Sequence, residues 1–148
     1  MKTSEKGIEL IKFYEKLKLK PYLCPAGVPT IGYGNTYYED GTKVKMTDKP
    51  ITKERAVSLL FITLFGFEMA VNKYVLSKIN QNQFDALVSF AYNVGVWNFR
   101  SSTLLKKVNL NPFDKDIAYQ FSRWNKSKGK VLNGLTKRRK KEAELYFS

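Results

Sequence analysis

Helical periodicity marks the start of the chain and returns after Pro50. Apolar residues recur at helical spacing over residues 8–17, which predicts an amphipathic first helix with Ser4 as its N-cap. Thr52 is the expected N-cap of a second, long helix. The middle of that helix, residues 59–67, is apolar nearly all round, as expected of a helix that passes through a core.

Further helices are expected in the C-terminal half. Asn82 can cap a helix that stops at Gly95, because glycine readily adopts the conformation that ends a helix. Pro112 fits the first turn of a later helix, where its missing N–H costs nothing. The expected ranges of these shorter helices are about 101–108, 112–123 and 136–146.

Residues 19–45 break the helical periodicity. Prolines and glycines punctuate short aromatic and β-branched runs, and residues 39–41 (Glu-Asp-Gly) are a hairpin signal. We therefore expect a small sheet of two or three strands. The predicted class is α+β in a single domain over residues 1–148. Its β-containing lobe covers about 15–50, and its helical lobe covers about 52–148 together with the first helix.

Composition narrows the class of protein. The 148 residues carry a net charge of +13, which attracts anionic partners such as nucleic acid, anionic lipid or an acidic wall polymer. One cysteine cannot form an internal disulfide. No signal-peptide pattern is visible, and the uncharged run 56–67 is shorter than the ~20 residues that span a bilayer. We expect a soluble protein made in the cytoplasm.

Three residues between positions 15 and 30 suggest hydrolytic chemistry. Glu15 ends the first helix, Cys24 is the only cysteine, and Thr30 precedes a Gly-Tyr-Gly run. Taken singly, they are explained as a solvated helix charge, a small buried side chain and a strand former. Together, an acid, a second polar group and a hydroxyl are what hydrolysis of a glycosidic bond requires.

The spacing of these residues resembles a known family. Glu15, eight residues, Cys24, five residues and Thr30 resemble the catalytic core of phage-type lysozymes (endolysins, glycoside hydrolase family 24), whose pattern has Asp or Cys at the second position. In two departures, Cys24 replaces the commoner Asp, and Asn35 follows Gly34 where many relatives carry His. The resemblance continues through residues 82–95, 99–105 and 134–139 and so covers nearly the whole chain.

The resemblance implies a lysozyme-like fold with an active site between its lobes. It implies a muramidase that cleaves the β-1,4 bond between N-acetylmuramic acid and N-acetylglucosamine in peptidoglycan during host lysis. Glu15 would be the general acid and Thr30 would hold the attacking water. Cys24 could stabilise a cationic transition state as thiolate, orient water or attack, and the sequence leaves these open. The candidate substrate-binding residues are Tyr33, Tyr92, Asn93, Ser102, Trp124 and Arg138.

The C-terminal charge suggests a second kind of partner. From residue 123 onward the chain has nine Lys or Arg residues and only two acidic residues. We therefore expect this segment to be attracted to an anionic outer envelope. No zinc-type cluster or phosphate loop occurs, and without His there is no Ser-His-Asp set, so we expect no metal and no cofactor. We expect a monomer that reaches the periplasm through a holin.

Two other readings compete with the muramidase. One is a non-catalytic basic helical protein that binds nucleic acid or the cell wall. The other is a muramidase fold in which Cys24 marks lost catalysis. The first lacks any helix-turn-helix, zinc-finger or RNA-recognition signature, and it leaves residues 30–34 unexplained. We therefore expect no nucleic-acid partner.

Overall fold

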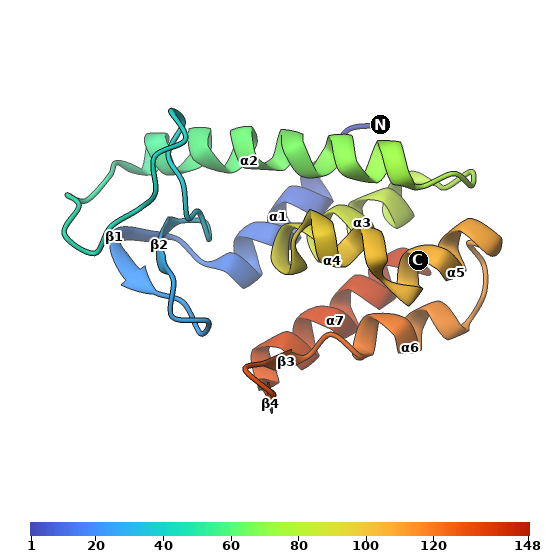
Figure 1. Cartoon of the computed structure of the whole chain (residues 1–148). Helices are drawn as coiled ribbons and strands as arrows, with labels where there is room; N and C mark the ends of the chain where they lie inside the picture. Colours follow the sequence, from blue (N-terminus) through green and yellow to red (C-terminus); the bar gives the residue numbers. More distant parts are fainter. The chain divides into compact units, whose positions relative to one another are not determined.

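The computed structural model describes residues 1–148, which form seven helices and four short strands. By its internal contacts the chain divides into two units, one of residues 12–65 and one of residues 1–11 with 66–148. Two helices run across this division, α1 (Glu5–Glu15) and α2 (Lys53–Tyr74), both visible in Figure 1. The α+β class expected from the sequence is confirmed.

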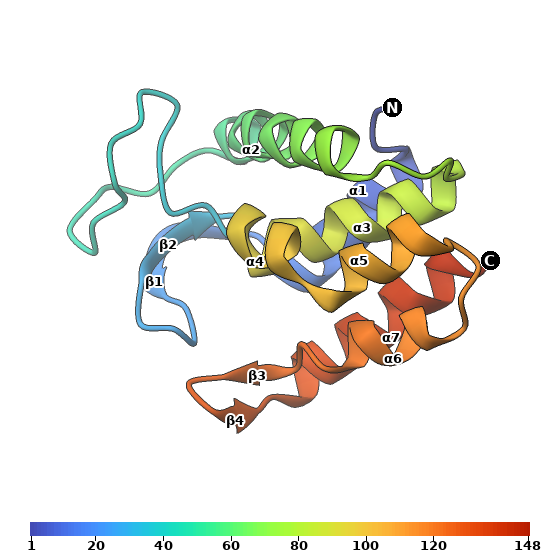
Figure 2. The same cartoon turned by 45° about the vertical axis from the view of Figure 1, so that its right-hand side comes forward.

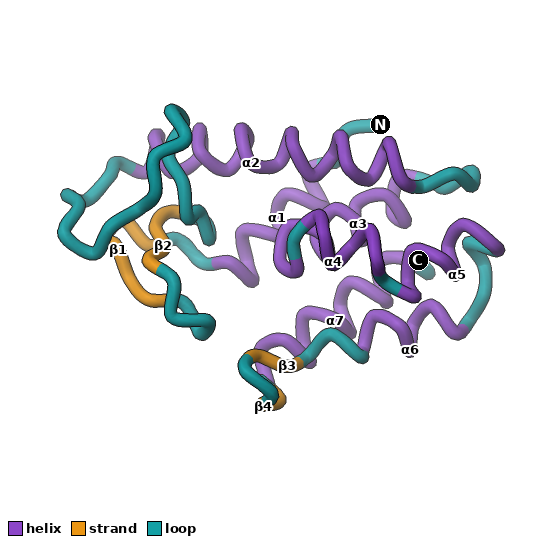
Figure 3. Tube along the Cα trace, viewed as in Figure 1, coloured by secondary structure: helices purple, strands orange, loops and turns teal.

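The unit of residues 12–65 contains the first sheet. Strand β1 (Lys18–Leu23) pairs antiparallel with β2 (Pro29–Gly32), as the orange segments of Figure 3 show. The pairing is irregular between Lys18 and Tyr22, where Pro21 has no N–H to give to the ladder. The hairpin signal at residues 39–41 is confirmed as a turn, but only an isolated bridge between Tyr37 and Lys43 flanks it.

Helix α2 begins where the sequence predicts, because the Thr52 hydroxyl accepts a hydrogen bond from the Arg55 backbone N–H at 3.1 Å. Its length and mean hydropathy, 1.4 over an 18-residue window, would suffice to cross a membrane, and 33% of that window is buried. The core helix of a soluble protein passes the same test, and α2 supplies core side chains. The buried residues of this unit include Ile31, Val44, Ile51, Ala56, Leu59, Leu60 and Leu64.

The other unit is helical apart from one hairpin. Its helices are α3 (Gln81–Val94), α4 (Val96–Ser101), α5 (Thr103–Leu110), α6 (Asp116–Ser122) and α7 (Asn133–Tyr146). Helix α7 packs against both α3 and α6, and Figure 2 shows α6 and α7 side by side. Phe90 lies at the centre of this core, with its ring 5.6 Å from those of Phe121 and Trp124.

A buried ion-pair cluster joins α3 to α7. Arg139 Nε lies 2.7 Å from Glu142 Oε1, and both side chains are fully buried. Arg138 Nε lies 3.3 Å from Glu142 Oε2, and its guanidinium also donates to the Ser89 carbonyl oxygen at 3.1 Å. The guanidinium of Arg139 lies 5.1 Å from the ring centroid of Phe90. Removing one partner would leave a buried charge uncompensated, which is strongly destabilising.

Three expected helix starts differ from the structure. Asn80, not Asn82, caps α3, because its side chain accepts from the Gln83 N–H at 2.8 Å while the Gln83 side chain accepts from the Asn80 N–H at 2.9 Å. The helix expected at 112–123 begins only at Asp116. Pro112 instead lies in a turn in which Asn111 Oδ1 accepts from the Phe113 N–H at 3.0 Å. The last helix begins earlier than expected, at Asn133.

Other differences concern elements between the expected helices. The range 101–108 holds parts of two helices, because the Ser102 hydroxyl accepts from the Leu105 N–H at 3.1 Å and starts α5 after α4 has ended. A hairpin of β3 (Lys126–Ser127) and β4 (Lys130–Val131) was not expected. Its turn is made by Lys128 and Gly129 at positive φ. The end of α3 at Gly95 is confirmed, with a φ of 91°.

Candidate active site

The carboxyl group of Glu15 lies directly against the Gly-Tyr-Gly turn. Helix α1 ends at Glu15, and Lys16 adopts a φ of 59°, which turns the chain into β1. Gly34 has a φ of 77°, and a Cβ built there would lie 2.6 Å from Glu15 Oε1 and 3.0 Å from Glu15 Cδ. Only glycine therefore allows the carboxyl group this position.

Asn35 anchors this turn to α2. Backbone hydrogen bonds between Ile31 and Asn35, at 2.8 and 2.9 Å, close the turn. The Asn35 side chain is 2% exposed, and its Nδ2 donates to Thr63 Oγ1 at 2.7 Å and to the Leu59 carbonyl at 3.3 Å. An amide donor thus does the anchoring at the position where the resemblance would put a histidine. Tyr33 is buried in the same turn, with Lys12 Nζ 5.8 Å from its ring centroid.

Cys24 lies in a turn whose N–H groups surround its sulfur. The Gly27 N–H donates to the Cys24 carbonyl at 2.7 Å, and the Cys24 N–H donates to the Val28 carbonyl at 3.1 Å. Burial raises the pKa of the Cys24 thiol. Hydrogen bonds to the sulfur from the backbone of Val28, Ala26 and Gly27 and from the Thr30 side chain outweigh burial, and the net pKa is lowered. The site therefore favours the thiolate.

Thr30 and Tyr22 complete the cluster. Thr30 is 2% exposed, and its hydroxyl donates to the Val28 carbonyl at 2.8 Å. Tyr22 on β1 is directly opposite Thr30 on β2. Burial raises the pKa of Tyr22, and the negative charges of Glu15 and Cys24 raise it further. The charges of both candidate catalytic side chains therefore act on this phenol.

Sequence reasoning missed Tyr22 and the reason for Gly34. Tyr22 stands only two residues before Cys24, and in a strand this spacing would place both side chains on one face. That signal was available but unspecific, because such spacing occurs in every strand. The approach of Glu15 to Gly34 is a tertiary contact that no local pattern encodes.

The remaining candidates belong to the other unit. Tyr92 is 8% exposed and packs on Phe67, with ring centroids 5.3 Å apart, while Asn93 is exposed. Ser102 caps α5 and Trp124 packs on Phe90. Arg138 is 2% exposed within the ion-pair cluster. A role in glycan binding stays a prediction for all of them.

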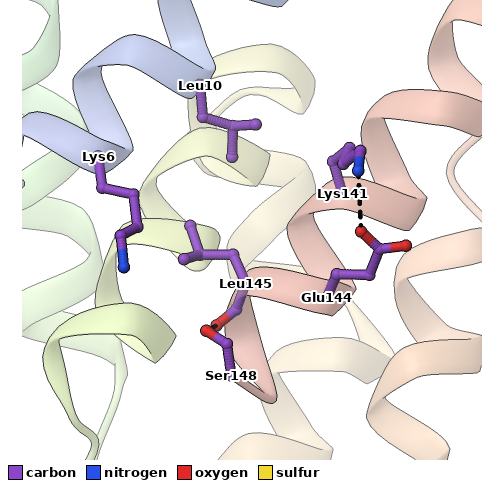
Figure 4. A pocket seen from close by; sticks show the side chains of 6 residues that line it. All are labelled: Lys6, Leu10, Lys141, Glu144, Leu145 and Ser148. Atoms are coloured by element: carbon purple, nitrogen blue, oxygen red, sulfur yellow. Dashed lines mark hydrogen bonds and ion pairs between the residues drawn. The ribbon is translucent and has the colours of Figure 1, made fainter.

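No three His, Cys, Asp or Glu side chains are grouped so that they could hold a metal ion. A hollow of about 360 Å³ in the helical unit is lined by residues of α1 and of the C-terminal end of the chain, namely Lys6, Leu10, Lys141, Glu144, Leu145 and Ser148 (Figure 4). Lys141 Nζ is 3.2 Å from Glu144 Oε2 at its edge. None of the candidate catalytic residues lines this hollow, because Glu15, Cys24 and Thr30 all belong to the other unit.

Comparisons with known proteins show the family to which the chain is similar. The family model of phage lysozyme matches residues 12–142. The endolysin of Bacillus phage B103 is 44% identical over 153 residues, covering 100% of this chain and 55% of that protein. The chain spans about half the length of this relative and of a second Bacillus-phage endolysin.

Solved structures agree with the sequence relatives. An endolysin from Escherichia coli O157:H7 phage FAHEc1 is 41% identical with a TM-score of 0.88, covering 100% of this chain and 94% of that one. The muramidase domain of SpmX from Asticaccaulis excentricus is 34% identical with a TM-score of 0.83, covering 99% of this chain and 98% of that one.

Proposed function

The chain belongs to the phage lysozyme family, and from this premise we propose that it is an endolysin muramidase. Its substrate would be peptidoglycan, cleaved at the β-1,4 bond between N-acetylmuramic acid and N-acetylglucosamine. The observation that carries the proposal is the Glu15 carboxyl group seated against Gly34, in the same unit as the Cys24 turn and Thr30.

In the proposed reaction Glu15 is the general acid. It gives its proton to the glycosidic oxygen as the bond to the leaving sugar breaks. The absence of a side chain at Gly34 supports this role, because a Cβ there would push the carboxyl group out of its place at the end of α1. A donor kept in its working geometry lowers the entropic cost of reaching the transition state.

In the proposed reaction Thr30 and Cys24 act on the attacking water and on the charge of the transition state. The Thr30 hydroxyl has one proton, which goes either to the Val28 carbonyl or to the Cys24 sulfur, and in both cases its lone pairs remain to accept a hydrogen bond from the attacking water. Cys24 as thiolate supplies the negative charge that an ionised Asp would supply. That charge stabilises the oxocarbenium-like transition state. The N–H groups around the sulfur support the thiolate assignment.

We propose the glycan contacts with unequal support. Asn93 is exposed and can meet a sugar directly. Tyr33 and Tyr92 are mostly buried, Trp124 packs on Phe90, and Ser102 and Arg138 already have partners within their unit. For these five residues, a contribution to the shape of the binding surface is better supported than a direct contact.

The basic C-terminal segment is proposed to attract the enzyme to an anionic envelope. Arg138 and Arg139 are buried against Glu142, so they do not contribute an exposed charge. The exposed cations of this segment are Arg123, Lys126, Lys128, Lys130, Lys137, Lys140 and Lys141. Synthesis in the host cytoplasm, release by a holin and action as a monomer in the periplasm complete the proposal.

The decisive experiment separates hydrolysis from binding. Purified peptidoglycan is incubated with the protein, and the soluble products are identified by mass spectrometry. A muramidase releases fragments with N-acetylmuramic acid at the reducing end, and Glu15→Gln releases almost none. Wall binding without soluble fragments would support the non-catalytic alternative instead.

A further inference from the structure

A side-chain hydrogen bond connects the turn of Gly34 to helix α2. The Ile31 N–H donates to the Asn35 carbonyl at 2.8 Å, and the Asn35 N–H donates to the Ile31 carbonyl at 2.9 Å. These bonds close the turn but do not connect it to α2. Asn35 Nδ2 makes that connection, because it donates to Thr63 Oγ1 at 2.7 Å and to the Leu59 carbonyl at 3.3 Å.

The chemistry of the two acceptors fixes the orientation of the Asn35 amide. A carbonyl oxygen can only accept a hydrogen bond, so the amide must turn its nitrogen toward Leu59. Leu59 and Thr63 stand four positions apart on α2 and therefore share one face of the helix. Asn35 is 2% exposed, so water competes little for its donors. The turn is thus held to α2 in one defined place.

The same turn lies against the candidate acid. Gly34 immediately precedes Asn35, and a Cβ built on Gly34 would lie 2.6 Å from Glu15 Oε1. The carboxyl group therefore lies beside the backbone of the residue next to Asn35. Glu15, Gly34, Asn35 and Thr63 all belong to residues 12–65, so the whole arrangement lies within one compact unit.

We propose that Asn35 and Thr63 are positioning residues for the general acid, because their hydrogen bond holds the turn against which the Glu15 carboxyl group lies. This inference rests on the proposed muramidase function. Without the bond, the backbone pair still closes the turn, but the turn can shift relative to α2. Displacements on the order of 1 Å can cost roughly 100-fold in rate, so a partial release of the turn should cost about tenfold.

The test compares two substitutions of Thr63. Thr63→Val keeps the branched shape and removes the acceptor, whereas Thr63→Ser keeps the hydroxyl. For Thr63→Val we expect kcat on peptidoglycan to fall about tenfold with KM near that of the parent, because Glu15 acts in the chemical step. Thr63→Ser should keep the parental kcat. Rates are compared at a temperature at which the melting curves show every variant folded.

Asn35→Ala removes the donor side of the same bond. It should lower kcat at least as much as Thr63→Val does. The double variant should be no slower than Asn35→Ala alone, since both changes remove one shared interaction. Tyr38→Phe is the matched control, because it removes a 2.8 Å hydrogen bond to Asp48 Oδ2 in the same unit. This control should lower the melting temperature and keep the parental kcat.

A second readout needs no wall substrate. Amide hydrogen exchange, followed by NMR, reports how readily the turn opens. In Thr63→Val the N–H groups of Ile31 and Asn35 should exchange up to about tenfold faster than in the parent, the scale of one lost hydrogen bond. The Ile51 N–H, which donates to the Leu19 carbonyl at 2.9 Å in the same unit, should keep its parental rate.

Several results would overturn the proposal. They are a parental kcat in Thr63→Val, a parental exchange rate of its turn amides, or an equal loss of kcat in Thr63→Ser. A loss of kcat in Tyr38→Phe as large as that in Thr63→Val would also overturn it, because the loss would then follow general stability. Faster exchange confined to the turn, in a protein that releases no soluble fragments, would keep the anchoring of the turn and remove the muramidase assignment.

Discussion

Replacing Gly34 by alanine should disable the enzyme without unfolding it. The added Cβ would lie 2.6 Å from Glu15 Oε1, whereas ordinary van der Waals contact begins near 3.4 Å. The carboxyl group must therefore retreat by about 0.8 Å, and displacements on the order of 1 Å can cost roughly 100-fold in rate. We expect kcat for Gly34→Ala to fall by about that factor.

The stability cost of this change should be modest. Gly34 has a φ of 77°, and a non-glycine residue in the left-handed region costs ~1–2 kcal/mol. For a chain of this size such a cost lowers the melting temperature by roughly 2–8 °C. Most of the protein therefore remains folded at the temperature of the activity assay.

Gly41 offers a matched control in the same unit. Its φ is 84°, but a Cβ there meets nothing within 4 Å. Gly41→Ala should lower the melting temperature by a similar amount and leave lysis intact. The assay is release of soluble fragments from purified peptidoglycan, with melting curves for both variants. If Gly34→Ala keeps the rate of Gly41→Ala, the contact between Gly34 and Glu15 does not position the acid.

Four further variants test the remaining parts of the proposal. Glu15→Gln keeps the shape but lacks the proton, and its lytic rate should fall ~10²–10⁴-fold at parental melting temperature; near-parental lysis would end the site assignment. Cys24→Ala should lose much of its activity at equal stability. Cys24→Asp should remain active to lower pH than the parent, because the parent loses its anion as pH falls through the thiol pKa, while a carboxyl stays ionised to ~3.9; equal rates for Cys24→Ala and the parent would make the thiol a space filler. Replacing Lys126, Lys128 and Lys130 by Gln should weaken wall binding at low salt and flatten the salt dependence of lysis, since exposed charges are screened beyond ~8 Å at physiological ionic strength; an unchanged salt dependence would contradict the electrostatic role of the hairpin.

The sequence by itself determined the helices whose signals are local. Thr52 caps α2, and Gly95 ends α3, because both act on backbone groups within four residues. The α+β class followed from the change of periodicity after residue 17 and its return after Pro50. The spacing of Glu15, Cys24 and Thr30 pointed to glycosidase chemistry only through the family resemblance. Without it, a glutamate, a cysteine and a threonine on a helix and two strands or turns specify no reaction.

At other positions the sequence offered two local structures, and the structure adopts one of them. Asn80 and Asn82 both suit an N-cap, and the reciprocal bonds with Gln83 decided for Asn80. Pro112 suits a helix start as well as a turn, and Asn111 stabilises the turn. Such choices differ by amounts near 1 kcal/mol, which a pattern of residue types does not resolve.

Only the tertiary structure decided what surrounds the chemistry. The contact of Glu15 with Gly34 joins residues 19 positions apart, and the anchoring of Asn35 on Thr63 joins residues 28 apart. The pairing of Tyr22 with Thr30 depends on strand register, and the burial of Arg138 and Arg139 depends on how α7 meets α3. Each of these is a packing contact between elements, and the free energy that selects it is gained only when both elements are already formed and in place.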